Sequence, residues 1–191
     1  LLSHRGPDNT GFFVQKDIGL FIGHKRLSII DVTDKSNQPM QIGDETIAYN
    51  GEIYNYIEIK KELMKSGEKF SSDGDTEILL RSWKKWGIKS LDKLDGMYSF
   101  ALFSNNRINL ITDPFGEKPL YYIKTNDGLY FSSEPKPLVE MLNLRKIMTN
   151  DQVLKFMILG HLDQEDTGYE GLIKIPPATH ISSDKNFKII H

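Results

Sequence analysis

Asn50-Gly51-Glu52 combines side-chain and backbone groups that could stabilise a developing negative charge. A glycine here follows an asparagine at the end of an expected strand, so a backbone N–H lies beside a side-chain amide. Two such donors can form an oxyanion hole, which holds the charged oxygen of an acyl-transfer intermediate. An Asn-Gly pair is at least as typical of a tight hairpin turn, so the local sequence leaves both interpretations open.

Three other polar segments carry alternatives of the same kind. Asp73-Gly74-Asp75 suits a binding loop, but it suits equally a loop that ends in a helix N-cap, where aspartate is favoured. His4-Arg5-Gly6-Pro7-Asp8 is rich in turn formers and by itself indicates a structural turn. Gly23-His24-Lys25-Arg26 could equally be a basic surface strand. No single segment therefore assigns a function.

The absence of cysteine limits what these residues can do unaided. With Cys 0 in 191 residues, the chain has no disulfide, no thiolate metal site and no cysteine nucleophile. The P-loop, H-E-x-x-H and G-x-S-x-G patterns are missing, and the 5 histidines form no cluster with carboxylates at metal-ligand spacing. We therefore expect no metal and no cofactor in this domain.

Charge and hydropathy narrow the choice of partners. Lysine and arginine total 24 against 26 acidic residues, and the net charge of −2 lacks the basic excess of a nucleic-acid binder. No apolar run approaches the roughly 20 residues that span a bilayer, and the first residues do not form a signal peptide. We expect a cytoplasmic protein that binds neither nucleic acid nor membranes.

The elements that must position the polar segments are mostly strands. Apolar and aromatic runs separated by turn signals predict strands over residues 11–15, 19–23, 46–49, 97–103, 108–112, 120–123 and 129–132. Asn126-Asp127-Gly128 predicts a hairpin turn, and Ser104-Asn105-Asn106-Arg107 predicts a second one. After the loop that contains Pro176-Pro177 a final strand is expected.

Helix signals are fewer but well marked. Helices are predicted from Asn55 to Ser66, from Asp75 or Thr76 to Gly87, through Leu91 and Leu94, and from Thr149 onward. A capping box is expected for the first helix, from Asn55 with Glu58, and for the last, from Thr149 with Gln152. The last helix is expected to have an apolar face formed by Val153, Phe156 and Met157. The absence of repeats and linkers predicts one α+β domain over residues 1–191.

Seven motifs occur in one order along the chain. They are S-H-R-G-P-D from Ser3, G-H-K-R-L-S-I-I-D from Gly23, Q-P-M from Gln38, Y-N-G-E-I-Y-N-Y from Tyr49, D-G-D-T-E from Asp73, L-D-G-M-Y-S-F-A-L from Leu94 and D-P-F-G-E-K-P-L-Y-Y from Asp113. Together they resemble the glutaminase domain of glutamine-hydrolysing asparagine synthetase, from Ser3 to about Ser182. The resemblance implies a class II glutamine amidotransferase domain with the N-terminal-nucleophile hydrolase fold. That fold stacks two antiparallel sheets between helical layers, and its first strands are expected to precede Leu1.

The resemblance places amino-acid recognition on four residues. Arg26 corresponds to the arginine that binds the α-carboxylate of glutamine, a role that suits a planar, bidentate donor. The backbone of Leu27 and Ile29 is expected to line the same pocket. Asp75 corresponds to the carboxylate that receives the substrate ammonium. Arg26 and Asp75 would together select a zwitterionic amino acid, L-glutamine.

The resemblance also implies a catalytic arrangement that this chain carries only in part. Asn50, through its side chain, and Gly51, through its N–H, correspond to the oxyanion hole, and Glu52 is a further substrate contact. In the family an N-terminal cysteine attacks the glutamine amide, with its own α-amino group as base. That cysteine is expected a few tens of residues before His4, so the chain alone is predicted to be inactive. Ser3, freed by cleavage of Leu1-Leu2, is an alternative nucleophile, but the match places it inside the domain.

The family has a second half, which implies further partners. A C-terminal synthetase domain, which uses ATP and magnesium to activate aspartate, would receive the ammonia, and its S-G-G-x-D-S phosphate loop does not occur in this sequence. A homodimer is a further partner expectation. Two alternatives remain open: an amidotransferase with a different acceptor, such as a sugar or peptide carboxylate, and a non-catalytic glutamine-binding or scaffold domain. Asp113-Pro114-Phe115-Gly116 and the residues after it are interpreted as a structural turn.

Overall fold

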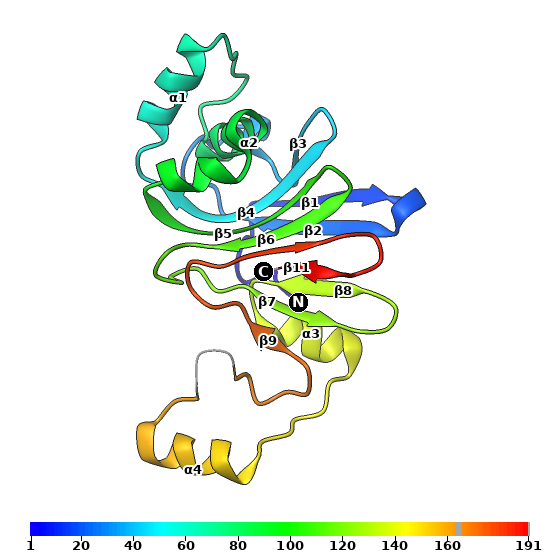
Figure 1. The fold of residues 1–191 in the computed structure, drawn as a ribbon. Coiled ribbons are helices and arrows are strands. Elements are labelled where there is room, and N and C mark those ends of the chain that lie inside the picture. The colour runs from blue at the N-terminus through cyan, green and yellow to red at the C-terminus, as the bar shows by residue number, and fades with distance from the viewer. Residues whose placement is uncertain (163–165, 191) are drawn as a thin grey trace.

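A six-stranded antiparallel sheet forms the centre of the molecule, in the order β11-β10-β6-β5-β4-β3 (Figure 1). We describe it from a computed structural model, which covers residues 1–162 and 166–190. The strands of this sheet are β3 (Met40–Ile42), β4 (Glu45–Ile53), β5 (Gly96–Ser104), β6 (Arg107–Thr112), β10 (His180–Ser183) and β11 (Ile189–Ile190). Strands β4 and β5 pair from Thr46 opposite Phe103 to Ile53 opposite Gly96, with Asn50 opposite Ser99 and Gly51 opposite Tyr98.

Two helices cover one face of this sheet. They are α1 (Tyr56–Lys65) and α2 (Asp75–Trp86), and a 3-10 segment, Gly87–Lys93, follows them. Because alternate residues of a strand point to the same face, Tyr98, Phe100 and Leu102 of β5 all pack in the cluster under these helices. Trp83 of α2 meets Phe100 edge to face, with the ring centroids 6.3 Å apart. This cluster is the larger of the two cores that the central sheet buries.

A three-stranded sheet in the order β8-β7-β9 packs on the other face. Its strands are β7 (Tyr121–Lys124), β8 (Leu129–Ser132) and β9 (Ile173–Lys174), and α3 (Pro135–Leu142) covers the side away from the central sheet. Ala101 and Leu110 of the central sheet share a core with Tyr122 and Phe131, whereas Ile123 packs against α3. The layers therefore run helix, sheet, sheet, helix, as the α+β prediction requires.

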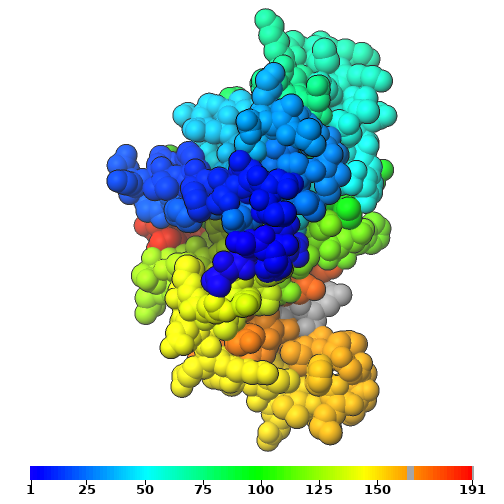
Figure 2. Space-filling model, turned by 180° about the vertical axis from the view of Figure 1, so that it is seen from behind, coloured from blue at the N-terminus to red at the C-terminus, as the bar shows by residue number. Residues whose placement is uncertain are grey.

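The N-terminal hairpin belongs to neither of these two sheets and forms a separate one, which differs from the expected arrangement of two sheets. Strands β1 (Asn9–Gln15) and β2 (Leu20–Arg26), joined by the 3-10 turn Lys16–Ile18, form a two-stranded ladder of their own. Phe12 and Phe21 lie exposed on its outer face, while Ile22 is buried. Figure 2 shows the N-terminal segment, in blue, lying across one face of the molecule beside the yellow segment that contains α3. Near the end of β2, His24 contacts β4 through the carbonyl of Tyr49, and Arg26 contacts the loop of residues 31–37.

Local turn and cap chemistry explains several elements. Asn105 and Asn106 adopt φ values of 51° and 57° in the β5–β6 hairpin, a conformation that asparagine tolerates. The capping box of Thr149 and Gln152 is confirmed by reciprocal hydrogen bonds of 3.2 and 2.9 Å. The capping box expected for Asn55 is wrong. Its side chain instead donates to the carbonyl of Lys93 at 2.8 Å and accepts from the N–H of Asp95 at 3.0 Å.

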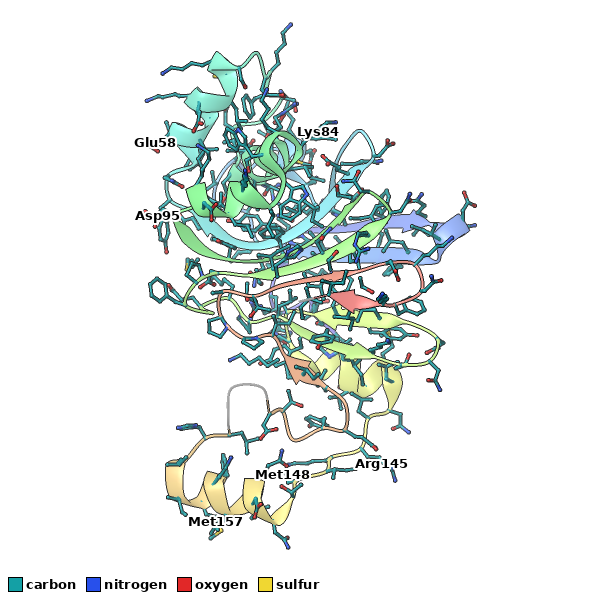
Figure 3. All side chains as sticks on the ribbon, in the orientation of Figure 1. Glu58, Lys84, Asp95, Arg145, Met148 and Met157 are labelled. Carbon is teal, nitrogen blue, oxygen red and sulfur yellow. The ribbon has the colours of Figure 1, made fainter. Side chains whose placement is uncertain are left out.

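Helix α4 (Asn150–Leu159) stands away from the body of the protein (Figures 1 and 3). The face expected to be apolar is present, but Val153, Phe156 and Met157 are 41%, 50% and 78% exposed. None of the helix residues is buried. Among the helices that the structure describes, none is long and apolar enough to cross a membrane.

Candidate functional site

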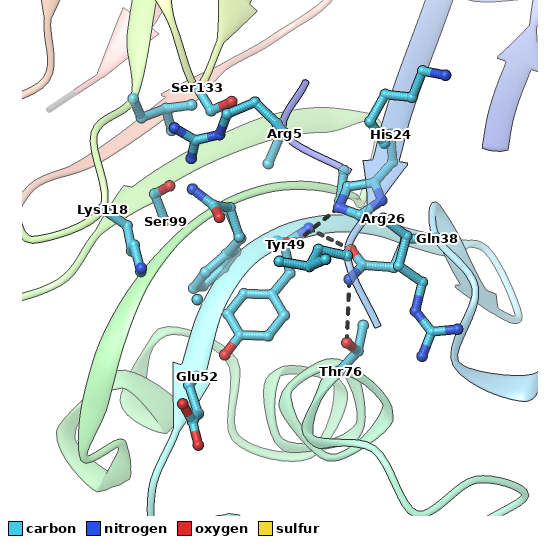
Figure 4. A pocket seen from close by; sticks show the side chains of 18 of the residues that line it. Arg5, His24, Arg26, Gln38, Tyr49, Glu52, Thr76, Ser99, Lys118 and Ser133 are labelled. Atoms are coloured by element: carbon cyan, nitrogen blue, oxygen red, sulfur yellow. Dashed lines mark hydrogen bonds between the residues drawn. The ribbon is translucent and has the colours of Figure 1, made fainter. Parts of the chain in front are cut away.

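A cavity of about 410 Å³ lies where β2, β4, β5 and β8 meet, next to the start of α2 (Figure 4). The polar segments that are far apart in the sequence converge on it. Its lining includes all the residues that the resemblance gives a substrate-binding or oxyanion role: Arg26, Leu27, Ile29, Asn50, Gly51, Glu52 and Asp75. In Figure 4, Arg5, Ser99 and Lys118 lie on one side of the cavity, and His24, Arg26 and Gln38 lie on the other.

One edge of β4 leaves a backbone donor open to this cavity. Strand β3 pairs with β4 only at residues 45–47, so the later part of β4 has no strand on that side. The N–H groups of Tyr49 and Ile53 on this edge donate to side chains instead, to Gln38 Oε1 at 2.6 Å and to Asp75 Oδ2 at 3.1 Å. Because N–H direction alternates along an antiparallel strand, the N–H of Gly51 faces the same edge. In the described part of the chain no side chain accepts a hydrogen bond from it.

The Asn50-Gly51 pair lies inside β4, so its interpretation as a hairpin turn is wrong. Glycine is needed here because β5 approaches closely: a Cβ on Gly51 would lie 2.2 Å from the carbonyl oxygen of Met97. The φ of 154° at Gly51 is also one that residues with a side chain rarely adopt.

The side chain of Asn50 adds a second donor. Its Nδ2 is buried and has no hydrogen-bond partner in the described part of the chain. Buried donors in native proteins are nearly always paired, so an unpaired one at a cavity points to a ligand atom as its partner. Asn50 Nδ2 and the Gly51 N–H therefore supply two neighbouring donors in one cavity.

Asp75 supplies the buried carboxylate of the site. It is the first residue of α2, and Gly74 is the N-cap without any side-chain cap, so the interpretation of this segment as an aspartate N-cap is wrong. Oδ2 of Asp75 accepts from the hydroxyl of Tyr49 at 2.8 Å and from the N–H of Ile53 at 3.1 Å. Burial raises the pKa of this carboxyl. A cation bound beside it would favour its ionised form.

Arg26 is a buried cation held by neutral groups. It is 6% exposed, and its Nη1 donates to the carbonyl of Thr33 and to Asn37 Oδ1, both at 2.9 Å. Its Nη2 donates to the carbonyl of Asp31. Among the described residues no carboxylate pairs with Arg26, so its charge has no counter-ion within the protein. Two of its five N–H donors remain for an incoming anion.

The rim of the cavity is formed by exposed residues. Leu27 and Ile29 are 57% and 73% exposed. The N–H of Ser28 between them donates to Asp8 Oδ2 at 2.7 Å. Glu52 follows Gly51 on β4 and lines the cavity as well.

The segment His4-Arg5-Gly6-Pro7-Asp8 is part of the site rather than only a turn. The carboxylate of Glu134 accepts from His4 Nε2 and from Arg5 Nη1, each at 3.1 Å. Arg5 itself lines the cavity. Sequence reasoning did not single out Glu134 as a site residue, because its partners lie 130 and 129 residues away in the chain.

His24 is a half-buried neutral side chain in the wall. Its Nε2–H donates to the carbonyl of Tyr49 at 3.1 Å, so the unprotonated nitrogen is Nδ1, which is buried without a partner in the described part of the chain. Burial, with a smaller contribution from the charge of Arg26, lowers the pKa of His24 to about 4.

We expect His24 to make the fold sensitive to mild acid. Because its pKa is lower in the folded state than the ordinary 6.5, its contribution to stability is present above pH 6.5 and falls as the pH drops toward 4. Between pH 7 and pH 5 the free energy of unfolding should decrease by about 2 kcal/mol more in the native protein than in His24→Gln. Urea titrations at both pH values test this, and an equal decrease in the two proteins would contradict it.

The fold places the protein in a known structural class. The chain is similar to the solved structure of the glutamine phosphoribosylpyrophosphate amidotransferase from Bacillus subtilis complexed with ADP and GMP, with a TM-score of 0.62 and 22% identity over 90% of this chain and 34% of that one. This likeness confirms the expected fold of the N-terminal-nucleophile amidotransferases.

The family follows from the sequence comparisons. Residues 1–189 match the family model described as "Glutamine amidotransferase domain", and the chain belongs to that family. It is 45% identical over 147 residues to asparagine synthetase [glutamine-hydrolyzing] 1 of Bacillus subtilis (strain 168), covering 75% of this chain and 23% of that protein. It is 33% identical over 192 residues to asparagine synthetase [glutamine-hydrolyzing] 3 of the same organism, covering 97% of this chain and 31% of the relative. The chain therefore spans about a quarter to a third of the length of these relatives.

Proposed function

We propose that this chain is the glutaminase domain of a glutamine-hydrolysing asparagine synthetase. The observation that carries the proposal is the content of the cavity: a buried arginine with no counter-ion among the described residues, a buried carboxylate, the Asn50 Nδ2 donor that no described residue pairs, and the neighbouring Gly51 N–H on the open edge of β4. A free amino acid with a side-chain amide needs these groups. Its α-carboxylate pairs with the cation, its ammonium with the carboxylate, and its amide oxygen accepts from the donors.

The proposed roles follow from the chemistry of each group. The two free N–H groups of Arg26 bind the α-carboxylate, and Asp75 binds the α-ammonium. The backbone of Leu27 and Ile29 closes the pocket around the amino-acid end of the substrate. This arrangement requires both charges on one molecule, so it would select free L-glutamine over peptides and simple amides.

The reaction is proposed to be acyl transfer to a thiol. The α-amino group takes the thiol proton, the thiolate attacks the amide carbon and the carbonyl oxygen becomes an oxyanion. The C–N bond then breaks as the nitrogen receives that proton and leaves as ammonia, and water hydrolyses the thioester to glutamate and the free thiol. Asn50 Nδ2 and the Gly51 N–H stabilise both oxyanions, with Glu52 as a further substrate contact. The chain has Cys 0, so we propose that the thiol precedes these residues and that they bind glutamine but do not hydrolyse it alone.

The ammonia is proposed to pass to a synthetase domain of the same protein. By resemblance, ATP and magnesium belong to that domain, where the carboxylate of aspartate is activated before amidation. Among the described residues no group of three His, Cys, Asp or Glu side chains could hold a metal ion. We further propose that residues 1–191 belong to one amidotransferase domain and that the enzyme is cytoplasmic. We also propose that the protein forms a homodimer.

Kinetics of the complete protein test the proposal. Glutamine should be hydrolysed, and with ATP, magnesium and aspartate either glutamine or ammonia should yield asparagine. Activity only with a sugar or peptide carboxylate would mean an amidotransferase with another acceptor. Glutamine binding without hydrolysis would mean a non-catalytic binding domain. Failure of glutamine to bind at all, measured by calorimetry on the same protein, would overturn the proposal.

A further inference from the structure

Asp31, the last residue of the G-H-K-R-L-S-I-I-D motif, lies between the two ends of the proposed amino-acid site. It has a positive φ of 50°, an uncommon conformation for a residue with a side chain. It opens the loop of residues 31–37, which contains the 3-10 turn Asp34–Ser36 and whose backbone and Asn37 hold the guanidinium of Arg26. The side-chain carboxylate of Asp31 has no part in the proposed oxyanion hole, nor in the proposed binding of the amino acid by Arg26 and Asp75.

The side chain of Asp31 accepts four hydrogen bonds. Oδ1 accepts from the N–H and the hydroxyl of Thr33, at 3.0 and 2.6 Å, and these bonds close the turn. Oδ2 accepts from the hydroxyl of Ser36 at 2.8 Å and from the N–H of Asp73 at 3.0 Å. The hydrogen bond from the Thr33 hydroxyl is the largest influence that holds the pKa of Asp31 well below its usual range. The carboxylate is therefore ionised, and all four acceptor positions are in use.

The contact with Asp73 joins the loop to the other half of the site. Asp73 lies two residues before Asp75, which is the carboxylate proposed to receive the substrate ammonium. The two segments touch at Gly74 as well, where a Cβ would lie 2.6 Å from Ser36 Oγ. Asp31 therefore contacts both halves of the site. Its side chain accepts from the segment that precedes Asp75, and its backbone carbonyl accepts from Arg26.

We propose that Asp31 is a positioning residue that sets the separation between Arg26 and Asp75, and thereby the selection of a ligand with a carboxylate and an ammonium on one carbon. The inference rests on the proposed function. An α-amino acid presents its two charges at one fixed spacing, so a site that binds both at once depends on how accurately the two protein groups are held apart. Asp31 itself touches no substrate.

Removing this link should weaken binding of the whole amino acid more than binding of either end. In Asp31→Asn one of the two oxygens is replaced by an amide nitrogen that cannot accept, so in either orientation of the amide only one of the two pairs of bonds is kept and the link between the segments is weakened. We expect the KM for glutamine to rise about 10-fold with kcat within a few-fold of the native value. For 4-carbamoylbutanoate, which lacks the α-amino group and uses only the arginine, kcat/KM should change little. The preference for glutamine over this analogue should therefore fall about 10-fold.

The experiment uses the complete protein, with the thermal unfolding transition of the glutaminase domain as the measure of correct folding. The matched control is Asp127→Asn, because Asp127 is also a turn carboxylate and accepts from Thr125 and Tyr130 in the β7–β8 hairpin, where it does not line the cavity. If Asp31→Asn does not fold, Ser36→Ala removes one of the four bonds and should give the same change at a smaller, few-fold size.

The outcomes separate this inference from the proposed function. Equal losses for glutamine and the analogue, or no loss for either, would overturn the positioning role. A loss of preference in Asp127→Asn as large as in Asp31→Asn would overturn it too. Arg26→Ala serves as the reference: if that variant leaves glutamine kinetics unchanged, the proposed function fails, and this inference fails with it.

Discussion

Replacing Asn50 by alanine in the complete protein should lower kcat for glutamine hydrolysis by about 100- to 1000-fold and leave KM within a few-fold of its native value. The reason is the buried Nδ2, which has no hydrogen-bond partner in the described part of the chain. A carbonyl oxygen accepts from it weakly, whereas the oxyanion of the transition state accepts strongly. The loss therefore falls on the chemical step. Steady-state release of glutamate at saturating glutamine measures it directly.

Asn55→Ala is the matched control for this variant. Asn55 is also an asparagine near the end of β4, but its side chain bonds the carbonyl of Lys93 and the N–H of Asp95 and does not line the cavity. Its replacement should lower the melting temperature without changing kcat. A large rise in KM for Asn50→Ala, with kcat intact, would contradict the oxyanion role and make Asn50 a residue of ground-state binding.

Arg26→Ala should raise the KM for glutamine about 100-fold or more, because a buried charge pair that loses one partner is weakened by about 2–5 kcal/mol. Arg26 has no carboxylate partner among the described residues, so its charge is available to the substrate. Ammonia-dependent amidation should persist, since ammonia needs no α-carboxylate site. Initial rates with glutamine and with ammonia, measured on the same preparation, separate the two effects.

Arg26→Lys distinguishes charge from geometry. Lysine keeps the positive charge, but it cannot donate from one planar group to the loop of residues 31–37 and to a carboxylate at the same time. We expect it to recover only part of the lost affinity. Native glutamine kinetics in Arg26→Ala would contradict the assignment, and equal loss of the glutamine and ammonia reactions would indicate a damaged fold instead.

The sequence predicted those parts of the fold that depend on neighbours along the chain. The hairpin at Asn105-Asn106 and the capping box of Thr149 and Gln152 need only a few consecutive residues, and both are present. Asn55 looked like the same kind of local signal, yet its side chain bonds residues 38 and 40 positions away. Nothing near Asn55 in the sequence indicates this contact.

The candidate site was predicted through its motifs rather than through its geometry. The ordered strings located Arg26, Asn50 and Asp75, and the fold brings them to one cavity. The supporting contacts were not predictable in the same way. The bond from Asp73 to Asp31 spans 42 residues, and it depends on how a loop after β2 meets the start of α2. Such contacts depend on how the layers of the fold pack together, and the pattern of residues around each partner does not indicate them.

The open edge of β4 also bears on whether copies of the protein aggregate with one another. Unpaired strand edges are templates on which other chains can add strands and aggregate. Along this edge Gln38 accepts a hydrogen bond from the N–H of Tyr49, and His24 donates one to the carbonyl of Tyr49. Asp75 accepts a hydrogen bond from the N–H of Ile53. An invading strand would find only isolated positions at which to pair. The side chains that leave one backbone donor open for a small ligand therefore also protect the edge against polymerisation.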